Sequence, residues 1–153
     1  IDESFEIAFW KAEISAGQVL PKNGNVFLSA KDRDKNWIIE IANELSNMGF
    51  NLFATSGTAK VLLDNNLDVQ ITNKLSEKGI NVIDLMKNNE VHLLINTPSG
   101  PVARVDEIKI RSEAILRGLP IVTTCSGARA TIKAIKTINN SEWNVKALQD
   151  FHG

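Results

Sequence analysis

The sequence predicts an α/β domain in which a mostly parallel sheet carries helices on both faces. Its 153 residues fit one domain and allow a sizeable core. A composition of 43% hydrophobic and 23% charged residues is that of a globular protein, which excludes disordered and fibrous classes. Short apolar runs alternate along the chain with segments of helical periodicity. This alternation is typical of a parallel sheet covered by helices.

The individual elements follow from the spacing of apolar residues. Apolar or alternating runs predict strands at 25–30, 50–54, 68–72, 91–95 and 119–124. Apolar residues three or four positions apart predict helices at 34–48, 58–65, 83–88, 105–117 and 126–138. In the helix expected at 105–117, the apolar positions that give the periodicity are Val105, Ile108, Ile115 and Leu116.

The start of the chain has a different character. Residues 3–16 predict a helix that Ser4 caps, and Pro21 and Gly24 mark the joint that follows. Because the first residue is not Met, we expect residues 1–20 to be a linker helix and joint from a preceding part of a longer polypeptide. Residues 21–153 are then the domain itself. A trimmed or matured small protein is the alternative.

Charge and cysteine content exclude several functions. The 17 Lys and Arg residues balance 18 Asp and Glu residues, so no basic surface points to nucleic acid. No apolar run reaches the roughly 18 residues that a membrane span needs. The single Cys125 excludes an internal disulfide, and with only His92 and His152 the chain is a poor source of metal ligands. We expect a cytoplasmic protein that binds no metal.

Polar loops follow four of the predicted strands, at 29–35, 55–58, 96–100 and 123–127. The carboxyl ends of parallel strands meet at one edge of a sheet, where open α/β sheets bind ligands. Loops that combine hydroxyls or glycine with a helix N-terminus offer backbone N–H groups to an anion. Lys35 and Lys74 supply the positive charge that a phosphate also needs. Together these loops predict a phosphate-binding crevice.

Each loop also has a simpler interpretation. Thr58, Ser99 and Ser126 stand where hydroxyl side chains commonly cap helices, and the charged residues at 31–35 are typical of a solvated face. Glycines in such loops often only permit a tight turn. The crevice is favoured because four such loops converge on one edge of the sheet.

No catalytic residue is predicted. We expect His92 to be a packed histidine within its strand and Cys125 to be a small core thiol. The aspartates show neither the paired spacing of acid–base catalysis nor that of a metal site. The chain also lacks the GxxxxGK[ST] and GxGxxG phosphate-binding motifs.

Four segments in order, NVFLSAKDRDK, GFNLFATSGTA, LLINTPSG and IVTTCSGARA, resemble the methylglyoxal synthase-like domain superfamily. More narrowly, the chain resembles the C-terminal allosteric domain of the large subunit of carbamoyl phosphate synthetase. The flanking segments FWKAEISAGQVLPKNG and WNVKALQDFHG are similar to the joint that precedes this domain and to the end of that subunit. The resemblance covers essentially the whole chain.

The resemblance implies a Rossmann-like, three-layer domain with five parallel strands that binds an effector and catalyses nothing itself. The effector is a nucleotide of the UMP or IMP type. The positions that match the family's phosphate site are Lys35, Thr55, Thr58 and Lys74. The positions that match its effector pocket are Ser29, Gly57, Asn96, Thr97, Ser99, Thr123 and Thr124.

The resemblance also implies a parent enzyme that makes carbamoyl phosphate from glutamine, bicarbonate and ATP, for pyrimidine and arginine biosynthesis. This parent is a ligase that uses ATP with Mg or Mn at sites outside this chain. The implied partners are the rest of the large subunit and the glutaminase small subunit.

The chain departs from the family at two places. An arginine expected in the segment after Lys74 is absent, and Pro101-Val102 stands where relatives have two arginines. Lys78 or Arg104 are the cations that would compensate. Nucleotide choice, and regulation itself, therefore stay open, and a domain that binds no ligand is a further possibility.

A methylglyoxal synthase-type lyase acting on dihydroxyacetone phosphate is the alternative function. That chemistry uses an aspartate of a Gly-Gly-Asp stretch, where this chain offers only Glu77. It also uses a first loop with a histidine before aspartate, where this chain has Lys31-Asp32.

Overall fold

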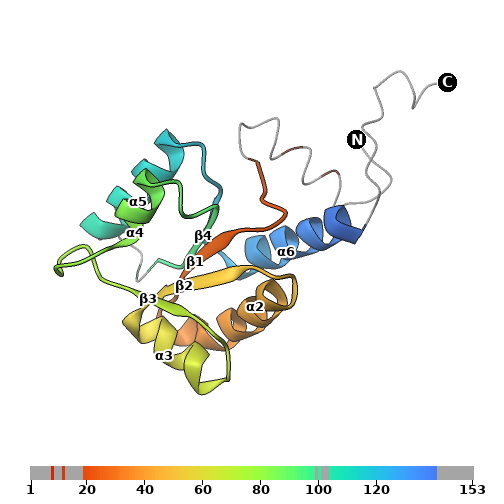
Figure 1. Ribbon diagram of the computed structural model, residues 1–153, viewed down its shortest axis with the longest axis horizontal. Helices are drawn as coiled ribbons and strands as arrows, with labels where there is room; N and C mark the ends of the chain where they lie inside the picture. Colours follow the sequence, from red (N-terminus) through yellow and green to blue (C-terminus); the bar gives the residue numbers. More distant parts are fainter. Residues whose placement is uncertain (1–7, 9–11, 13–18, 99, 101–103, 141–153) are drawn as a thin grey trace.

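The computed structural model describes residues 8, 12, 19–98, 100 and 104–140, which form an α/β fold with a five-stranded sheet (Figure 1). The sheet has the order β3-β2-β1-β4-β5, and all neighbouring strands run parallel. The strands are β1 (Asn25–Ser29), β2 (Asn51–Thr55), β3 (Gln70–Thr72), β4 (Leu93–Asn96) and β5 (Ile121–Val122). The predicted fold class is confirmed.

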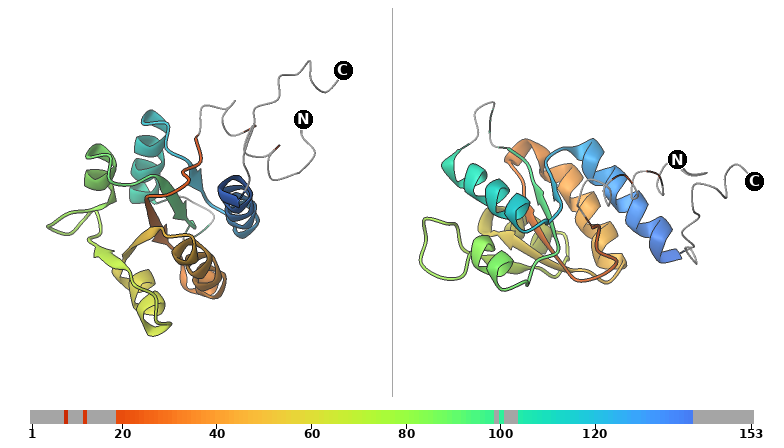
Figure 2. Two further views of the ribbon diagram at one scale, coloured as in Figure 1. Left: turned by 45° about the vertical axis from the view of Figure 1, so that its right-hand side comes forward. Right: turned by 90° about the horizontal axis from the view of Figure 1, so that it is seen from above.

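Helices cover both faces of the sheet (Figure 2). The helical elements are a 3-10 turn η1 (Asp32–Asp34), α2 (Lys35–Asn47), α3 (Ser56–Asp64), α4 (Val82–Lys87), α5 (Val105–Leu116) and α6 (Cys125–Asn140). Helices α2, α3 and α6 pack on one face, and α4 and α5 pack on the other. Within the described residues, no helix combines the length and apolar character that a membrane crossing requires.

Alternation along the strands builds two separate cores. Val26 and Leu28 of β1 belong to the cluster under α2, α3 and α6, whereas Phe27 between them belongs to the cluster under α4 and α5. This is the expected consequence of side chains that point to opposite faces in turn. Both faces of the sheet are therefore buried, which explains why its strands are continuous apolar runs.

The five strands and five helices predicted between residues 25 and 138 all form, with shifted ends. The largest difference is β5, which has two residues instead of the six expected at 119–124. Pro120 has no N–H to donate to a ladder, although its carbonyl oxygen accepts a hydrogen bond from the amide of Leu94 at 3.0 Å. The predicted linker helix lies almost entirely outside the described residues, and the boundary at residue 20 stays a prediction.

The expectation that His92 is packed inside a strand is wrong. His92 is exposed and precedes β4, which begins at Leu93. Its Nδ1 accepts a hydrogen bond from the backbone N–H of Asn25 at 3.0 Å. A side chain on Gly24, whose φ is +119°, would meet this ring at 2.5 Å, so the turn into β1 requires glycine.

The strand order sets the place of a ligand site. Strands β1, β2 and β3 run outward in one direction, and β4 and β5 are added on the other side of β1. The order therefore reverses between β1 and β4. In open α/β sheets, ligands bind beyond the carboxyl ends of the strands at such a reversal.

Candidate functional site

Polar side chains end four neighbouring strands at this edge. Ser29 at the end of β1 pairs with Asn96 of β4, and Thr55 at the end of β2 pairs with Thr72 of β3. Ser29 shares its face with Phe27, two residues earlier, which packs with α4 and α5. Thr72 is 5% exposed, and its hydroxyl has no hydrogen-bond partner in the described part of the chain. We call these residues (Thr72, Thr55, Ser29 and Asn96) the polar ledge.

A cavity of 220 Å³ lies at the polar ledge, between the strand ends and α5. Its apolar lining consists of Phe27, Ala30, Leu75, Val82 and Ile110. Its neutral polar lining consists of Ser29, Thr55, Asn73, Asn96 and Thr97. Its charged lining consists of Lys31, Lys74, Arg104, Asp106 and Glu107. The cavity therefore offers apolar walls, hydrogen-bonding groups and charges of both signs.

The N-terminus of α3 lies open beside this cavity. Thr55 is the N-cap residue of α3, yet its hydroxyl makes no capping hydrogen bond. The ammonium group of Lys35 lies 3.7 Å from the place that a Cβ on Gly57 would take, which is an ordinary contact distance. A helix N-terminus carries partial positive charge and free N–H groups. Two positive groups thus face one space, an arrangement that favours an anion.

A carboxylate already lies beside Lys35. Asp32 Oδ1 lies 2.6 Å from Lys35 Nζ, and the Asp32 side chain is 96% exposed. The hydrogen bond from Lys35, and then its charge, hold the pKa of Asp32 below its usual value. The lysine itself is only 20% exposed, so it is not part of a freely solvated face. A bound anion would compete with this exposed carboxylate for the ammonium group.

Two threonine hydroxyls fix the loop that follows β1. Thr58 Oγ1 accepts a hydrogen bond from the backbone N–H of Ala30 at 3.0 Å and donates one to the Ala30 carbonyl oxygen at 3.4 Å. Thr97 Oγ1 accepts one from the backbone N–H of Lys31 at 3.1 Å. Both threonines are buried. The predicted site residue Thr58 therefore joins α3 to β1 through its hydroxyl.

Asp34 holds the same loop from the other side. Its carboxylate accepts a hydrogen bond from Trp37 Nε1 at 3.0 Å and lies 3.7 Å from Lys31 Nζ. Burial raises the pKa of Asp34, but hydrogen bonds from Trp37 and Thr97 and the charges of Lys31 and Arg33 outweigh it and lower the pKa below its usual value. The carboxylate is thus held ionised, and it keeps Lys31 at the cavity.

The structure brings most of the predicted site residues together. Ser29, Thr55, Lys74, Asn96 and Thr97 line the cavity, and the space between Lys35 and Gly57 adjoins it through Thr55. The other four predicted residues do not line the cavity in the described structure. Thr58 bonds the backbone of Ala30, and the others are Thr123, Thr124 and Ser99.

The two threonines after β5 do not line the cavity. Thr124 Oγ1 accepts a hydrogen bond from the backbone N–H of Gly127 at 3.0 Å, so it caps α6. This cap is the role that the simpler interpretation gave to Ser126. Ser99 lies outside the described residues.

Sequence reasoning missed several lining residues. Asn73 follows β3 directly and so lies at the same edge, but the loop after β3 was not among the four loops predicted to form the crevice. Arg104, Asp106 and Ile110 come from α5, whose course over the strand ends cannot be read from periodicity. Lys31 stood in the expected loop but was weighed as part of a solvated face; its side chain is 18% exposed.

The described residues offer no metal centre. In this part of the chain, no three His, Cys, Asp or Glu side chains gather where they could hold a metal ion. Cys125 is half-buried at the first position of α6 and is not bonded to another cysteine.

Comparison with known proteins gives a consistent family. The profile of the MGS-like domain matches residues 37–123. A carbamoyl phosphate synthase large chain from Nostoc sp. is 44% identical over 151 residues, which are 99% of this chain and 14% of the relative. The C-terminal section of the corresponding protein from Methanocaldococcus jannaschii is 42% identical over 98% of this chain and 24% of the relative.

The fold has a solved counterpart. A methylglyoxal synthase from Elizabethkingia anophelis superposes with a TM-score of 0.57 at 16% identity, covering 74% of this chain and 79% of the enzyme. This likeness concerns the fold. The matches to large chains extend over nearly the whole of this chain, which spans only 14% of the Nostoc relative. On the match over residues 37–123, the chain belongs to the MGS-like domain family.

Proposed function

We propose that this chain is the effector-binding regulatory domain of a carbamoyl phosphate synthase large chain, and that its ligand is a nucleoside monophosphate of the UMP or IMP type. The observation that carries the proposal is the open N-terminus of α3, with the Lys35 ammonium above Gly57. This anion site adjoins the cavity at Thr55, which belongs to both. A ligand with a phosphate at one end and an uncharged ring at the other fits this pair of sites.

Positive groups would hold the phosphate end of the ligand. Free N–H groups of the first turn of α3 and the ammonium group of Lys35 would donate to the phosphate oxygens. Lys74, which lines the cavity, adds a second ammonium group. Arg104 also lines the cavity, and it is one of the two cations expected to compensate for the missing arginines.

The remaining lining of the cavity would contact the nucleoside end of the ligand. Phe27, Val82 and Ile110 provide apolar surface for a flat base. Hydroxyl and amide groups of Ser29 and Asn96 stand on the polar ledge, where they can bond ribose or base. The carboxylate of Asp106 is an acceptor for ligand hydroxyls or amino groups.

The proposed domain binds and does not catalyse. In the parent enzyme, ATP and its Mg or Mn ions would be held outside this chain, and its partners would be the rest of the large subunit and a glutaminase small subunit in the cytoplasm. The effector would act by binding one state of this assembly more tightly than another. The 44% identity to a large chain supports this placement.

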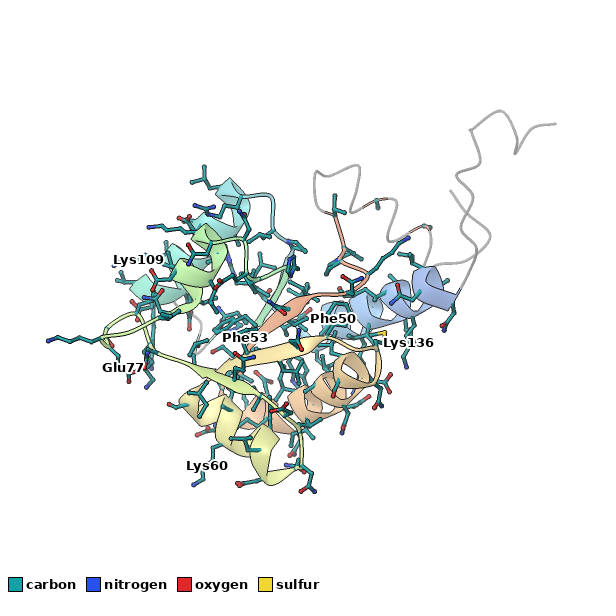
Figure 3. The ribbon with its side chains drawn as sticks, viewed as in Figure 1. Phe50, Phe53, Lys60, Glu77, Lys109 and Lys136 are labelled. Atoms are coloured by element: carbon teal, nitrogen blue, oxygen red, sulfur yellow. The ribbon has the colours of Figure 1, made fainter. Side chains whose placement is uncertain are left out.

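A methylglyoxal synthase-type lyase is the weaker candidate. Glu77, the carboxylate that would replace the catalytic aspartate, accepts a hydrogen bond from the backbone N–H of Lys74 at 3.0 Å. It does not line the cavity, and Figure 3 shows it on the outer loop beyond β3. Glu77 is therefore not placed to act as the base of this reaction, and only the likeness of fold supports the lyase.

The test is calorimetric titration with UMP, IMP and uridine, with Gly57→Asp and Gly57→Ala as matched variants. Losing the phosphate removes at least two charge-assisted hydrogen bonds of about 1.5–3 kcal/mol each, so uridine should bind more weakly than UMP by a factor of at least about 100. The Gly57→Asp carboxylate would occupy the space beside Lys35 and abolish binding. Gly57→Ala adds one methyl group at ordinary contact distance and should bind within a few-fold of the original chain.

Three results would count against the proposal. Absence of binding by both nucleotides would remove effector regulation, and equal affinity for uridine and UMP would remove the phosphate site. Release of inorganic phosphate from dihydroxyacetone phosphate by the chain would instead favour the lyase.

A further inference from the structure

Helix α5 exposes an apolar stripe on the side that faces away from the sheet. Among the described residues, eight large hydrophobic side chains are exposed, and four of these lie on α5. They are Val105, Ile108, Ile115 and Leu116, with exposures of 66%, 54%, 64% and 78%. We call them the α5 stripe. Exposed apolar residues that are scattered singly over a surface need no explanation, but four on one helix of about three turns indicate a contact surface.

The stripe and the cavity use opposite sides of the same helix. Ile110 and Ala114 are the buried residues of α5, and they lie about half a turn from the α5 stripe. Ile110 also lines the cavity, together with Asp106 and Glu107 from the first turns. A surface that packs on the α5 stripe would therefore be separated from a ligand in the cavity only by α5 itself.

The charges beside the stripe describe its partner. Lys109 and Arg111 flank the stripe on its two sides and are both exposed. Neither forms an ion pair with another residue of the described chain. Lys109, labelled in Figure 3, lies on the outer part of α5. A surface with apolar residues at its centre and carboxylates at its edges would satisfy both the stripe and these cations.

A second copy of the chain fits this surface poorly. In a symmetric antiparallel pair of α5 helices, Ile108 of one copy would face Ile115 of the other. The centre of such a pair lies near Arg111, so the two Arg111 side chains would be brought together. Like charges that face each other across an interface disfavour that pairing.

We propose that the α5 stripe docks on an apolar, carboxylate-edged surface elsewhere in the large chain, and that α5 relays ligand binding to it. The proposal rests on the proposed function, because it needs the rest of a large chain. The large chain from Nostoc is about seven times as long as this chain, which spans 14% of it. The docked helix carries the cavity wall on one side and the partner on the other. A ligand that shifts α5 therefore changes the contact.

The first experiment measures burial of the stripe in the complete large chain. Ile108→Cys and Leu116→Cys are labelled with a maleimide, with Leu63→Cys on α3, where Leu63 is 46% exposed, as the matched control. Labelling is read peptide by peptide by mass spectrometry and normalised to the rate in urea. We expect positions 108 and 116 to react at least tenfold more slowly than position 63. Equal rates at the three positions would overturn the docking proposal.

The second experiment separates docking from ligand binding. Arg111→Glu in the large chain should raise the labelling rate at position 116 at least tenfold and abolish the effect of UMP or IMP on activity, while the nucleotide still binds. Lys60→Glu, a charge reversal on exposed α3, is the control and should change neither property. An Arg111→Glu chain that keeps both protection and regulation would refute the relay.

Two further outcomes have distinct meanings. Protection that depends on protein concentration and accompanies dimerisation in ultracentrifugation would assign the stripe to a second copy and overturn the proposed partner. A large chain that binds no nucleotide, yet protects positions 108 and 116, would remove the proposed effector and the relay but leave the docking surface intact.

Discussion

Replacing a buried threonine with valine should have opposite effects on stability at two positions of this fold. Thr58 and Thr72 are 2% and 5% exposed, so replacing either with valine keeps shape and removes a buried hydroxyl. The hydroxyl of Thr58 bonds both backbone groups of Ala30, whereas that of Thr72 has no partner among the described residues. Thr58→Val should therefore destabilise the fold, and Thr72→Val should stabilise it.

The magnitudes follow from the state of each hydroxyl. Thr58→Val leaves the backbone N–H of Ala30 unpaired, at a cost of about 1–3 kcal/mol. Thr72→Val removes a buried, unsatisfied hydroxyl and should gain about 1 kcal/mol. Valine and threonine have similar helix and strand propensities, so propensity contributes little to the difference. The two variants should differ by about 2–4 kcal/mol in the free energy of unfolding.

Thermal and urea unfolding followed by circular dichroism measure this difference. At about 2–4 °C per kcal/mol for a chain of this size, Tm should separate by about 4–16 °C, with the original protein between the two variants. If Thr72→Val loses as much stability as Thr58→Val, the Thr72 hydroxyl does form a hydrogen bond in the folded protein, and the prediction is wrong. If Thr58→Val is neutral, its bonds to Ala30 do not hold the loop.

Two further predictions concern the residues at the N-termini of α2 and α4. Asp34 has a pKa below its usual 3.8, so its carboxylate stabilises the fold above about pH 3.8 and loses this contribution as pH falls through the folded-state value. Asp34→Asn should therefore cost about 1–3 kcal/mol in urea unfolding at pH 7, and clearly less at pH 3; an equal cost at both would contradict it. Asn81 and Asp84 form a capping box at the start of α4. Asn81→Ala should therefore lower the free energy of unfolding by about 1 kcal/mol in urea titrations. An unchanged urea midpoint would mean that the cap does not stabilise the fold.

The sequence was sufficient for the architecture because two simple rules operate here. Strands buried on both faces are short apolar runs, and the helices between them keep their own periodicity. The rule that parallel strands end at one edge then placed Ser29, Thr55 and Asn96 in a common site. The same rule also placed Thr123 and Thr124 there, but they do not line the cavity. These inferences need only the chain direction and the period of each element.

The sequence could not show where each hydroxyl points. Thr58 and Thr55 stand three residues apart around the start of α3, yet one bonds backbone and the other lines the cavity. Such choices depend on which neighbouring strand lies within hydrogen-bonding distance. Likewise, the residues whose spacing predicted α5 proved to be its exposed ones, while Ile110 and Ala114 face the sheet. Periodicity finds an apolar face but not which side the fold covers.

The strand order has a mechanical consequence. In the sheet, the β1–β2–β3 segment and the β4–β5 segment meet along one seam, the ladder from Val26–Leu93 to Ser29–Asn96. A molecule that bonds both Ser29 and Asn96 would hold the two segments together at the carboxyl ends of β1 and β4. Its first signature would then be slower hydrogen exchange of the amides in β1 and β4, including those far from the molecule itself.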